Sequence, residues 1–425
     1  MPLISVDEAR ALLSRYALPP LAAKTPLEDA LGRVLAADVR ADRDLPPFDR
    51  SAVDGYAVAF RGAWKSGVEF REVGRIAAGE SWPGVLRAGE ALRIMTGAPA
   101  PPGTRGVVMV ERSRRTDPSS GGNRIVLEGP LEGEHPGFAP RGEDARRGTV
   151  VVPRDTKLEA SHLAVLASVG AVEIATFAPA LVAIVSTGGE IVPALSTPRA
   201  EEIRNSNAPF LRALLGATGA AIVQSMSTAV DQDRALERAL ERAEASRVVV
   251  MTGGVSQGDF DRVPHVLRSR GWRVRLHGVA MRPGKPLLFG TVGSGGARRA
   301  VFALPGNPVS VLATAWEFLA PYLRVAAGAG RRESGPALMT PWTWTARLTD
   351  SIVRKPGLTH FVPARCVPGE DGRWQVTALA WNGSGDFVAA SRANCLAPLD
   401  AVRPRARAGQ LIPIHPLFRE AWHAA

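Results

Sequence analysis

The sequence contains few cysteines and lacks long apolar runs. Of its 425 residues only Cys366 and Cys395 are cysteine, which excludes a disulfide framework and a zinc-ligand spacing. The seven histidines have no ligand spacing either. No apolar run reaches the ~18–20 residues of a membrane span, and the N-terminus, with Asp7 and Glu8, lacks a basic-then-apolar signal pattern. We therefore expect a soluble, cytoplasmic protein without a membrane partner.

Lysine is also scarce, although positive charge predominates. The formal net charge is +11, yet nearly all basic residues are arginine; the only lysines are Lys24, Lys65, Lys157, Lys285 and Lys355. The arginines are scattered, and no basic run alternates with aromatic residues. This pattern disfavours a nucleic-acid partner and favours a solvated arginine-rich surface. Anionic small molecules remain compatible with the charge.

The first part of the chain predicts a helical opening domain interrupted by a β-rich insertion. Ser5 to Glu8 is a capping box, and Thr25 to Glu28 is a second one with proline at the first helical position, so two short helices are expected. From about Pro46 to Pro140, short apolar runs alternate with Gly/Pro turns, which predicts strands. Val150 to Val152 and Ala160 to Val169 then predict a strand and a helix.

The rest of the chain predicts an α/β domain followed by a small β domain. Alternation of strand and helix patterns favours a mostly parallel sheet covered by helices. The expected strands are 181–185, 220–224, 247–251, 273–276, 287–289 and 300–304. The expected helices are 208–215, 234–245, 262–270 and 308–326. After a linker at 327–341, strands are expected at 342–346, 360–367 and 374–381.

The predicted fold class is therefore α/β plus β, with several domains. Residues 1–45 and 141–178 form the expected N-terminal helical and linker domain, and 46–140 the inserted β-rich domain. Residues 179–326 form a central doubly wound α/β domain, and 327–425 a C-terminal small β-barrel.

The most informative stretch runs from Val248 to Asp261. An apolar strand breaks at Thr252-Gly253-Gly254, and a helix is expected from about Asp259. Strand, glycine turn and helix together present backbone N–H groups to an anion. Asp259 and Asp261 beside the turn suggest a phosphate bound together with a divalent cation, because carboxylates alone would repel a phosphate. The alternative is a purely structural loop.

Polar residues follow several expected strands at their carboxyl ends, where open α/β folds bind ligands. They are Ser186 to Glu190, Asp231, Thr252 to Asp261 and Pro305 to Pro308. Two cations, Arg282 and Lys285, lie in a Met-Arg-Pro-Gly-Lys-Pro turn that its prolines and glycine make stiff. A rigid pair of cations suits a small oxyanion; a surface turn with two solvated charges is the alternative.

A series of motifs runs in order through nearly the whole chain. Phe48 to Ala57 reads Phe-Asp-Arg-Ser-Ala-Val-Asp-Gly-Tyr-Ala. Further motifs are 93–99, 141–144, 186–190, 205–207, 252–261, 282–285, 304–310, 383–385 and 393–394. Together they resemble the MoeA family of molybdopterin molybdenumtransferases, which includes the gephyrin E domain and carries the signature Phe-Asp-Asn-Ser-Ala-Met-Asp-Gly-Tyr-Ala.

The resemblance implies insertion of molybdate into adenylylated molybdopterin, with molybdenum cofactor and AMP as products and Mg²⁺ as the assisting cation. It implies four domains, with the α/β domain binding molybdopterin. It also implies a homodimer whose site draws on both subunits, and other proteins of molybdenum cofactor biosynthesis as further partners.

By position, the resemblance assigns catalytic roles to Asp54, Glu190, Asp231 and Asp261, and metal binding to the last three. The implied substrate-binding residues are Thr96, Asp144, Thr187, Gly188, Thr252, Gly253, Gly254, Ser256, Arg282, Lys285, Pro305, Asn307 and Pro308. Arg282 and Lys285 match the cationic turn, and Pro305 and Pro308 match the loop that lines the molybdate pocket. For each acid the alternative is a helix cap or a structural turn residue.

Three departures from the family pattern affect the expected site. Arg50 replaces an Asn, Gly189 replaces the Asp of a Ser-Thr-Gly-Asp-Glu motif, and Arg105 replaces a common Asp. The departures are also compatible with a second function. The protein would then be a scaffold that binds molybdopterin but does not insert molybdate, comparable to the anchoring role of gephyrin. A third possibility, an adenylyltransferase, fits a separate single-domain relative better. The sequence does not distinguish molybdate from tungstate as the oxyanion.

Overall fold

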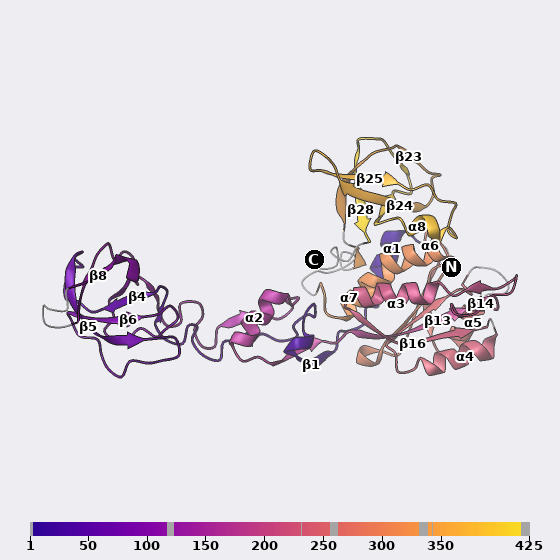
Figure 1. Cartoon of the computed structure of the whole chain (residues 1–425). Coiled ribbons are helices and arrows are strands. Elements are labelled where there is room, and N and C mark those ends of the chain that lie inside the picture. Colours follow the sequence, from indigo (N-terminus) through magenta and orange to yellow (C-terminus); the bar gives the residue numbers. More distant parts are fainter. Residues whose placement is uncertain are drawn as a thin grey trace. The chain divides into compact units, whose positions relative to one another are not determined.

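The computed structural model describes residues 3–116, 123–230, 232–255, 262–330, 339–341 and 343–417. The chain divides into two compact units (Figure 1). Unit 1 comprises Met1–Ala37, Arg154–Ala160 and Glu173–Ala425, and unit 2 comprises Asp38–Pro153 and Ser161–Val172. The four-domain boundaries derived from the sequence stay a prediction.

Unit 2 is built around a six-stranded sheet, as expected for the β-rich segment. Its strands, in the order β7–β4–β6–β5–β9–β8, are Gly106–Met109, Gly55–Val58, Glu90–Ile94, Val68–Ile76, Arg124–Leu127 and Ser113–Arg115. Alternate residues of one strand enter different apolar clusters: Ala57 joins one, and Tyr56 and Val58 join the other. This period of two means that both faces of the sheet are covered.

Short elements complete the described part of unit 2. They are the pair β2 (Val39–Arg40) and β11 (Val150–Val152), the pair β3 (Arg50–Ser51) and β10 (Phe138–Ala139), the 3₁₀ turn Val110–Arg112 and helix α2 (Ala160–Ser168). The strand and the helix predicted after the insertion are thus confirmed.

The centre of unit 1 is a second six-stranded sheet. Its strands, in the order β16–β13–β17–β21–β20–β18, are Ala221–Ala229, Ala180–Thr187, Val248–Thr252, Arg299–Leu304, Leu288–Val292 and Arg273–His277. The first four are parallel, whereas β20 is antiparallel to both β21 and β18. The connection at 293–298 is too short for a parallel crossover, which takes a dozen or more residues.

Helices cover both faces of this sheet, which confirms the doubly wound α/β prediction (Figure 1). The helices are α1 (Val6–Arg15), α3 (Asn207–Ala217), α4 (Asp233–Arg242), α5 (Val263–Ser269), α6 (Pro308–Thr314) and α7 (Ala320–Ala326). Every residue of β17 is buried. Val248 and Val250 pack in the cluster that contains α1, α3 and α7, and Val249 and Met251 pack with α4 and α5.

Of the two predicted capping boxes, only the first exists. The Ser5 hydroxyl accepts from the N–H of Glu8, and the Glu8 carboxylate accepts from the N–H of Ser5. The helix predicted at Thr25 is wrong: Ala22–Pro26 is strand β1, paired with β12 (Glu173–Phe177), and Leu27–Asp29 is a 3₁₀ turn without a side-chain cap. The Thr25 hydroxyl lies 2.7 Å from that of Thr176, so the two side chains form a hydrogen bond between β1 and β12.

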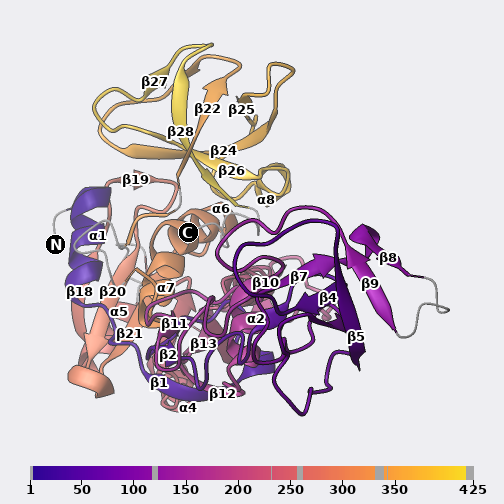
Figure 2. The same cartoon turned by 90° about the vertical axis from the view of Figure 1, so that its left-hand side faces the viewer.

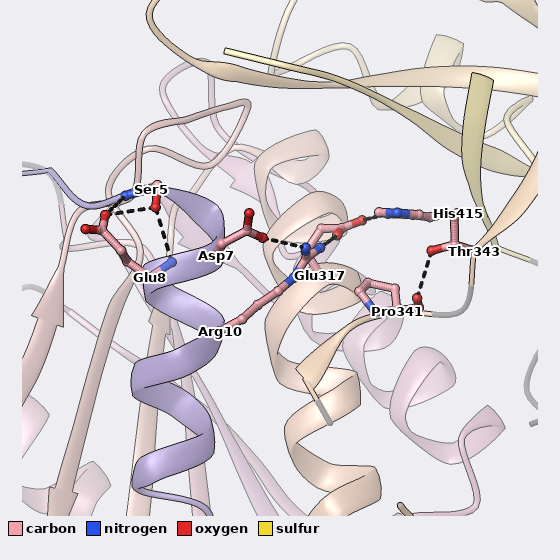
Figure 3. Close-up of polar contacts among 8 residues, drawn as sticks. All are labelled: Ser5, Asp7, Glu8, Arg10, Glu317, Pro341, Thr343 and His415. Carbon is pink, nitrogen blue, oxygen red and sulfur yellow. Dashed lines mark hydrogen bonds and ion pairs between the residues drawn. The ribbon is translucent and has the colours of Figure 1, made fainter. Parts of the chain in front are cut away.

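The helix predicted at 308–326 is continuous but changes type. A π-helical segment, Ala315–Leu319, lies between α6 and α7 and places Glu317, 0% exposed, in the interior. Nη2 of Arg10 on α1 donates to Oε2 of Glu317 at 2.8 Å, and Nδ1 of His415 lies 2.6 Å from Oε1 (Figure 3). Glu317 thus joins helix α1 to strand β28 of the C-terminal domain.

The C-terminal part of unit 1 is the expected small barrel (Figure 2). The strands, in closing order β24–β25–β22–β28–β26, are Thr359–Pro368, Trp374–Ala378, Trp344–Leu348, Leu411–Pro416 and Cys395–Leu399. Pairing of β26 with β24 closes the ring. Strand β19 (Met281–Arg282) joins β24 from the α/β side. Also present are the pair β23 (Ile352–Val353) and β27 (Arg405–Ala406), and helix α8 (Phe387–Ala390).

Both cysteines are buried in this barrel as free thiols. Burial raises the pKa of the Cys366 thiol above its ordinary value. Across the described ranges, the helices are all too short or too polar to span a bilayer.

Candidate functional site

Two adjoining cavities lie in unit 1, the first at the carboxyl ends of β13, β17 and β21 and the second beside the segment that follows β21. We call the first the glycine-turn cavity; its volume is about 360 Å³. It is lined by Ser186, Thr187, Glu190, Ile191, 203–207, 252–255, Pro286 and 305–308. Of the predicted site residues it brings together Thr187, Glu190, Thr252, Gly253, Gly254, Pro305, Asn307 and Pro308.

The glycine turn after β17 needs glycine for two reasons. Gly253 has a φ of +91°, and a Cβ there would lie 2.5 Å from the carbonyl oxygen of Thr187. The Thr187 hydroxyl donates to the Thr252 carbonyl at 3.2 Å, and both threonines are buried. The N–H of Gly253 donates to the carbonyl of Leu304, so this N–H is occupied within the sheet edge. The close approach of β13 and β17 therefore shapes the floor of the cavity.

The segment between β15 (Ile203–Arg204) and α3 supplies polar groups that the sequence analysis did not assign to the site. Nδ2 of Asn205 donates to the Ser186 hydroxyl at 2.9 Å, and its Oδ1 accepts from the N–H of Ala208 in the first turn of α3. Nδ2 of Asn207 donates to the Gly306 carbonyl at 2.7 Å. Oδ1 of Asn207 is buried and accepts no hydrogen bond from any described residue. A ligand N–H could satisfy this oxygen.

Glu190 lines the same cavity and is exposed, directly before the short strand β14 (Ile191–Val192), which pairs with β15. Its carboxylate is the oxygen type that Mg²⁺ prefers. The other predicted metal ligands, Asp231 and Asp261, and the predicted binding residue Ser256 lie outside the described residues, as does Asp259. The described residues contain no cluster of three or more His, Cys, Asp or Glu. The three-residue metal site stays a prediction.

The second cavity, about 960 Å³, we call the cationic cavity. It is lined by 281–286, Pro305, Asn307, Ser310, 353–355, Leu358, 360–362 and 381–384. It contains the predicted pair Arg282 and Lys285, and shares Pro286, Pro305 and Asn307 with the glycine-turn cavity. Its lining comes from both the α/β domain and the barrel.

The cationic turn is held between these two domains. In the ladder between β19 and β24, Arg282 pairs with His360 of the barrel. Gly284 has a φ of +109°, and a Cβ there would lie 2.5 Å from Cγ2 of Thr314 on α6. Pro283 and Gly284 are buried, whereas Arg282 and Lys285 are exposed to the cavity side. The buried backbone at Pro283 and Gly284 therefore fixes the positions of the Cα atoms from which the Arg282 and Lys285 side chains extend.

Further hydrogen bonds join the barrel to the N-terminus of α6. Nδ2 of Asn307 donates to the Ser384 hydroxyl at 2.9 Å, and the Ser384 carbonyl accepts from the N–H of Val309. Asn307 thus lines both cavities and touches both domains. Ser384 belongs to a Gly-Ser-Gly motif that the sequence analysis noted without assigning it a role.

The remaining predicted residues lie elsewhere. Gly188, with a φ of +145°, follows β13 but does not line either cavity. Asp54, Thr96 and Asp144 belong to unit 2 and are exposed. The N–H and the hydroxyl of Thr96 both donate to Oδ1 of Asp54, and these bonds, the N–H first, lower the pKa of Asp54.

The three departures from the family pattern are compatible with the fold. Arg50 is exposed in β3. The Arg105 guanidinium lies 5.4 Å from the centre of the Phe60 ring, so it packs as a cation–π partner. Gly189 is exposed, and a Cβ there would meet no atom within 4 Å. The missing acid at this position therefore has no steric cause.

The chain matches three consecutive family models. They are described as the MoeA N-terminal region (domains I and II), a probable molybdopterin binding domain, and the MoeA C-terminal region (domain IV). They match residues 4–170, 183–325 and 345–417.

Individual relatives are similar in sequence to this chain over most of their length. The chain is 30% identical over 393 residues to a molybdopterin molybdenumtransferase of Staphylococcus aureus, covering 91% of this chain and 89% of the relative. It is 35% identical over 309 residues to one of a Nostoc species, covering 70% and 68%. The crystal structure of a molybdopterin biosynthesis MoeA protein of Pyrococcus horikoshii has a TM-score of 0.79 and 26% identity, and covers 98% of this chain and all of that one. With its domains in this order and cavities at the predicted sheet edge, the chain belongs to the MoeA family, the molybdopterin molybdenumtransferases.

Proposed function

We propose that this protein inserts molybdate into adenylylated molybdopterin, forming molybdenum cofactor and releasing AMP. The observation that carries the proposal is the pair of cavities that share Pro286, Pro305 and Asn307. One suits a phosphate-bearing ligand and the other a small oxyanion. Two reactants held side by side react as if in one molecule, which is a large source of rate acceleration.

The glycine-turn cavity would hold the pterin part of the substrate and a phosphate next to it. The N-terminal turn of α3 opens onto it, and a helix N-terminus favours negative charge. The exposed Arg204 adds a cation to the lining. Oδ1 of Asn207, which accepts no hydrogen bond from the described residues, would accept one from an N–H of the ring system.

The cationic turn would hold the molybdate. Arg282 can donate two parallel hydrogen bonds to an oxyanion, and Lys285 provides a compact charge. Because Pro283 and Gly284 are buried, the turn loses little entropy when the oxyanion binds. Asn307, between the cavities, would orient the groups that react.

We also propose that Mg²⁺ is bound by Glu190 together with Asp231 and Asp261. The ion would neutralise the phosphates next to these acids. The carboxylate of Glu190 in the cavity lining supports this proposal. Removing Mg²⁺ with a chelator should stop AMP release without displacing molybdate from the cationic turn.

We propose further that the protein acts as a homodimer whose site draws on both subunits. Sedimentation should give about twice the 45.0 kDa chain mass. A shared site predicts that, at low molybdate concentration, mixed dimers of the impaired variants Asp54→Asn and Lys285→Ala are more active than either homodimer. A monomer, or mixed dimers no more active than the average of the two homodimers, would contradict the shared site.

The proposed reaction is tested by supplying adenylylated molybdopterin, molybdate and Mg²⁺ and then adding a cofactor-free molybdoenzyme. Active molybdoenzyme is expected. Binding of adenylylated molybdopterin without any cofactor formation would instead favour the scaffold function.

A further inference from the structure

The cationic cavity holds more positive charge than a molybdate dianion requires. Besides Arg282 and Lys285, its lining includes Arg354 and Lys355, which follow strand β23 of the barrel. No Asp or Glu among the described residues lines the cavity. None of the four cations forms an ion pair with a described residue, so two positive charges remain when a dianion is bound.

The two pairs of cations meet near one buried side chain, His360, which is 6% exposed. Arg282 lies opposite His360 in the ladder between β19 and β24. On the barrel side, Nε2 of His360 lies 3.0 Å from the carbonyl oxygen of Lys355. Burial, and to a lesser extent Arg282 and Arg354, lower the pKa of His360. His360 is therefore a neutral part of the wall near pH 7 and adds no further positive charge.

The guanidinium of Arg354 is positioned by its own loop. Its Nη1 donates to the carbonyl of Val353 at 3.0 Å, and its backbone N–H donates to the carbonyl of Pro404. Arg354 is half-buried, and its other guanidinium nitrogens have no hydrogen-bond partner among the described residues. A held guanidinium with free N–H groups is suited to a phosphate or a carboxylate.

Like charges in one cavity repel each other unless anions join them. With a volume of about 960 Å³, the cavity has room for more than one tetrahedral oxyanion. We propose that Arg354 and Lys355 form a second anion subsite that binds a phosphate group of the nucleotide-linked pterin substrate while Arg282 and Lys285 bind the oxyanion. The identity of this phosphate rests on the proposed function, whereas the existence of two anion subsites does not.

The subsite is tested by calorimetry with inorganic phosphate, titrated with and without saturating molybdate at low ionic strength. The wild type should still bind phosphate when molybdate is bound. The double variant Arg354→Ala/Lys355→Ala should lose phosphate affinity by roughly tenfold or more, the usual scale for charge-assisted contacts, and should keep its molybdate affinity. Arg354→Lys, which keeps the charge, should retain most of the phosphate binding.

Arg365→Ala is the matched control, because Arg365 is an exposed arginine of β24 that does not line the cavity. It should bind both anions as the wild type does. Displacement of phosphate by molybdate, or phosphate binding that is insensitive to the double variant, would overturn the second subsite.

Turnover separates this inference from the proposed function. In an active wild type, the double variant should raise the KM for adenylylated molybdopterin about tenfold and leave the KM for molybdate nearly unchanged. A rise in the molybdate KM instead would assign Arg354 and Lys355 to the oxyanion and overturn the proposal. If the wild type bound both anions but released no AMP, the proposed function would fail and the two-anion cavity would stand.

Discussion

Asp54 and Thr96, 42 residues apart, are joined by two hydrogen bonds to one oxygen: Oδ1 of Asp54 accepts from the Thr96 N–H at 2.7 Å and from its hydroxyl at 2.8 Å. Sequence motifs assigned both residues to the site independently. The structure relates them, because Thr96 orients the Asp54 carboxylate and keeps it ionised. Oδ2 of Asp54 accepts no hydrogen bond from the described residues and is available to a reactant.

The first prediction concerns the pH dependence of Thr96→Ala. Because both Thr96 bonds lower the pKa of Asp54, removing the hydroxyl should raise that pKa towards its ordinary value. The acid side of the pH–rate profile for AMP release should then move to higher pH, whereas the rate at neutral pH should change little, because an Asp of ordinary pKa is already ionised there. Thr96→Ser keeps the hydroxyl and should resemble the wild type. An unchanged acid limb in Thr96→Ala would separate Asp54 from catalysis.

The second prediction concerns the glycine turn. Gly253→Ala places a Cβ 2.5 Å from the Thr187 carbonyl oxygen at a φ of +91°, so β13 and β17 must move apart. We expect a destabilisation of ~1–3 kcal/mol or more and weaker binding of adenylylated molybdopterin. Gly189→Ala is the control, since its Cβ meets nothing within 4 Å. Chemical denaturation and equilibrium binding measure both effects; equal behaviour of the two variants would refute the close-approach argument.

The third prediction compares two ion pairs of equal length. Arg10–Glu317 and Arg270–Glu241 both measure 2.8 Å, but Glu317 is fully buried and Glu241 is half-exposed. Arg10→Ala leaves a buried carboxylate with His415 as its one remaining side-chain partner among the described residues, which should cost ~3–5 kcal/mol. Arg270→Ala should cost at most ~1 kcal/mol.

The denaturant midpoint of the transition that involves the barrel measures this difference. Similar midpoints for the two variants would mean that the Glu317 contact does not hold the barrel to the α/β domain.

The fourth prediction concerns the cationic turn. Lys285→Ala should raise the KM for molybdate roughly tenfold, because a doubly charged oxyanion loses one of its charge-assisted contacts. Binding of adenylylated molybdopterin should stay nearly intact, and Lys285→Arg should recover part of the molybdate use. Equal losses of affinity for molybdate and for adenylylated molybdopterin would instead indicate that Lys285 contacts the phosphates.

The sequence predicted the sheet edge that carries the site, because apolar runs mark β13, β17 and β21 and the carboxyl ends of parallel strands converge. Prediction from the sequence failed where contacts between residues far apart in the chain decide the structure. Thr25 has a local helix signal, but pairing of β1 with β12 overrides it. Nothing in the local sequence of the helix predicted at 308–326 marks Glu317 as buried; its burial is explained by the π-helical segment and by partners from two distant segments.

The barrel side of the cationic cavity could not be predicted for the same reason. Arg354 and His360 lie in a segment that the sequence assigned to a separate β domain. They reach Arg282 only because β19 adds to β24 as an extra strand. Two-residue strands have no periodicity by which a sequence could reveal them.

The central claim is that two adjoining cavities couple molybdate insertion to the release of AMP. Its most direct test is to follow AMP release from bound adenylylated molybdopterin before and after molybdate is added, in the presence of Mg²⁺. We predict little AMP without molybdate, and one AMP per cofactor formed once molybdate is present. AMP release at the same rate with and without molybdate would contradict the claim, because the nucleotide would then be cleaved independently of the cationic cavity.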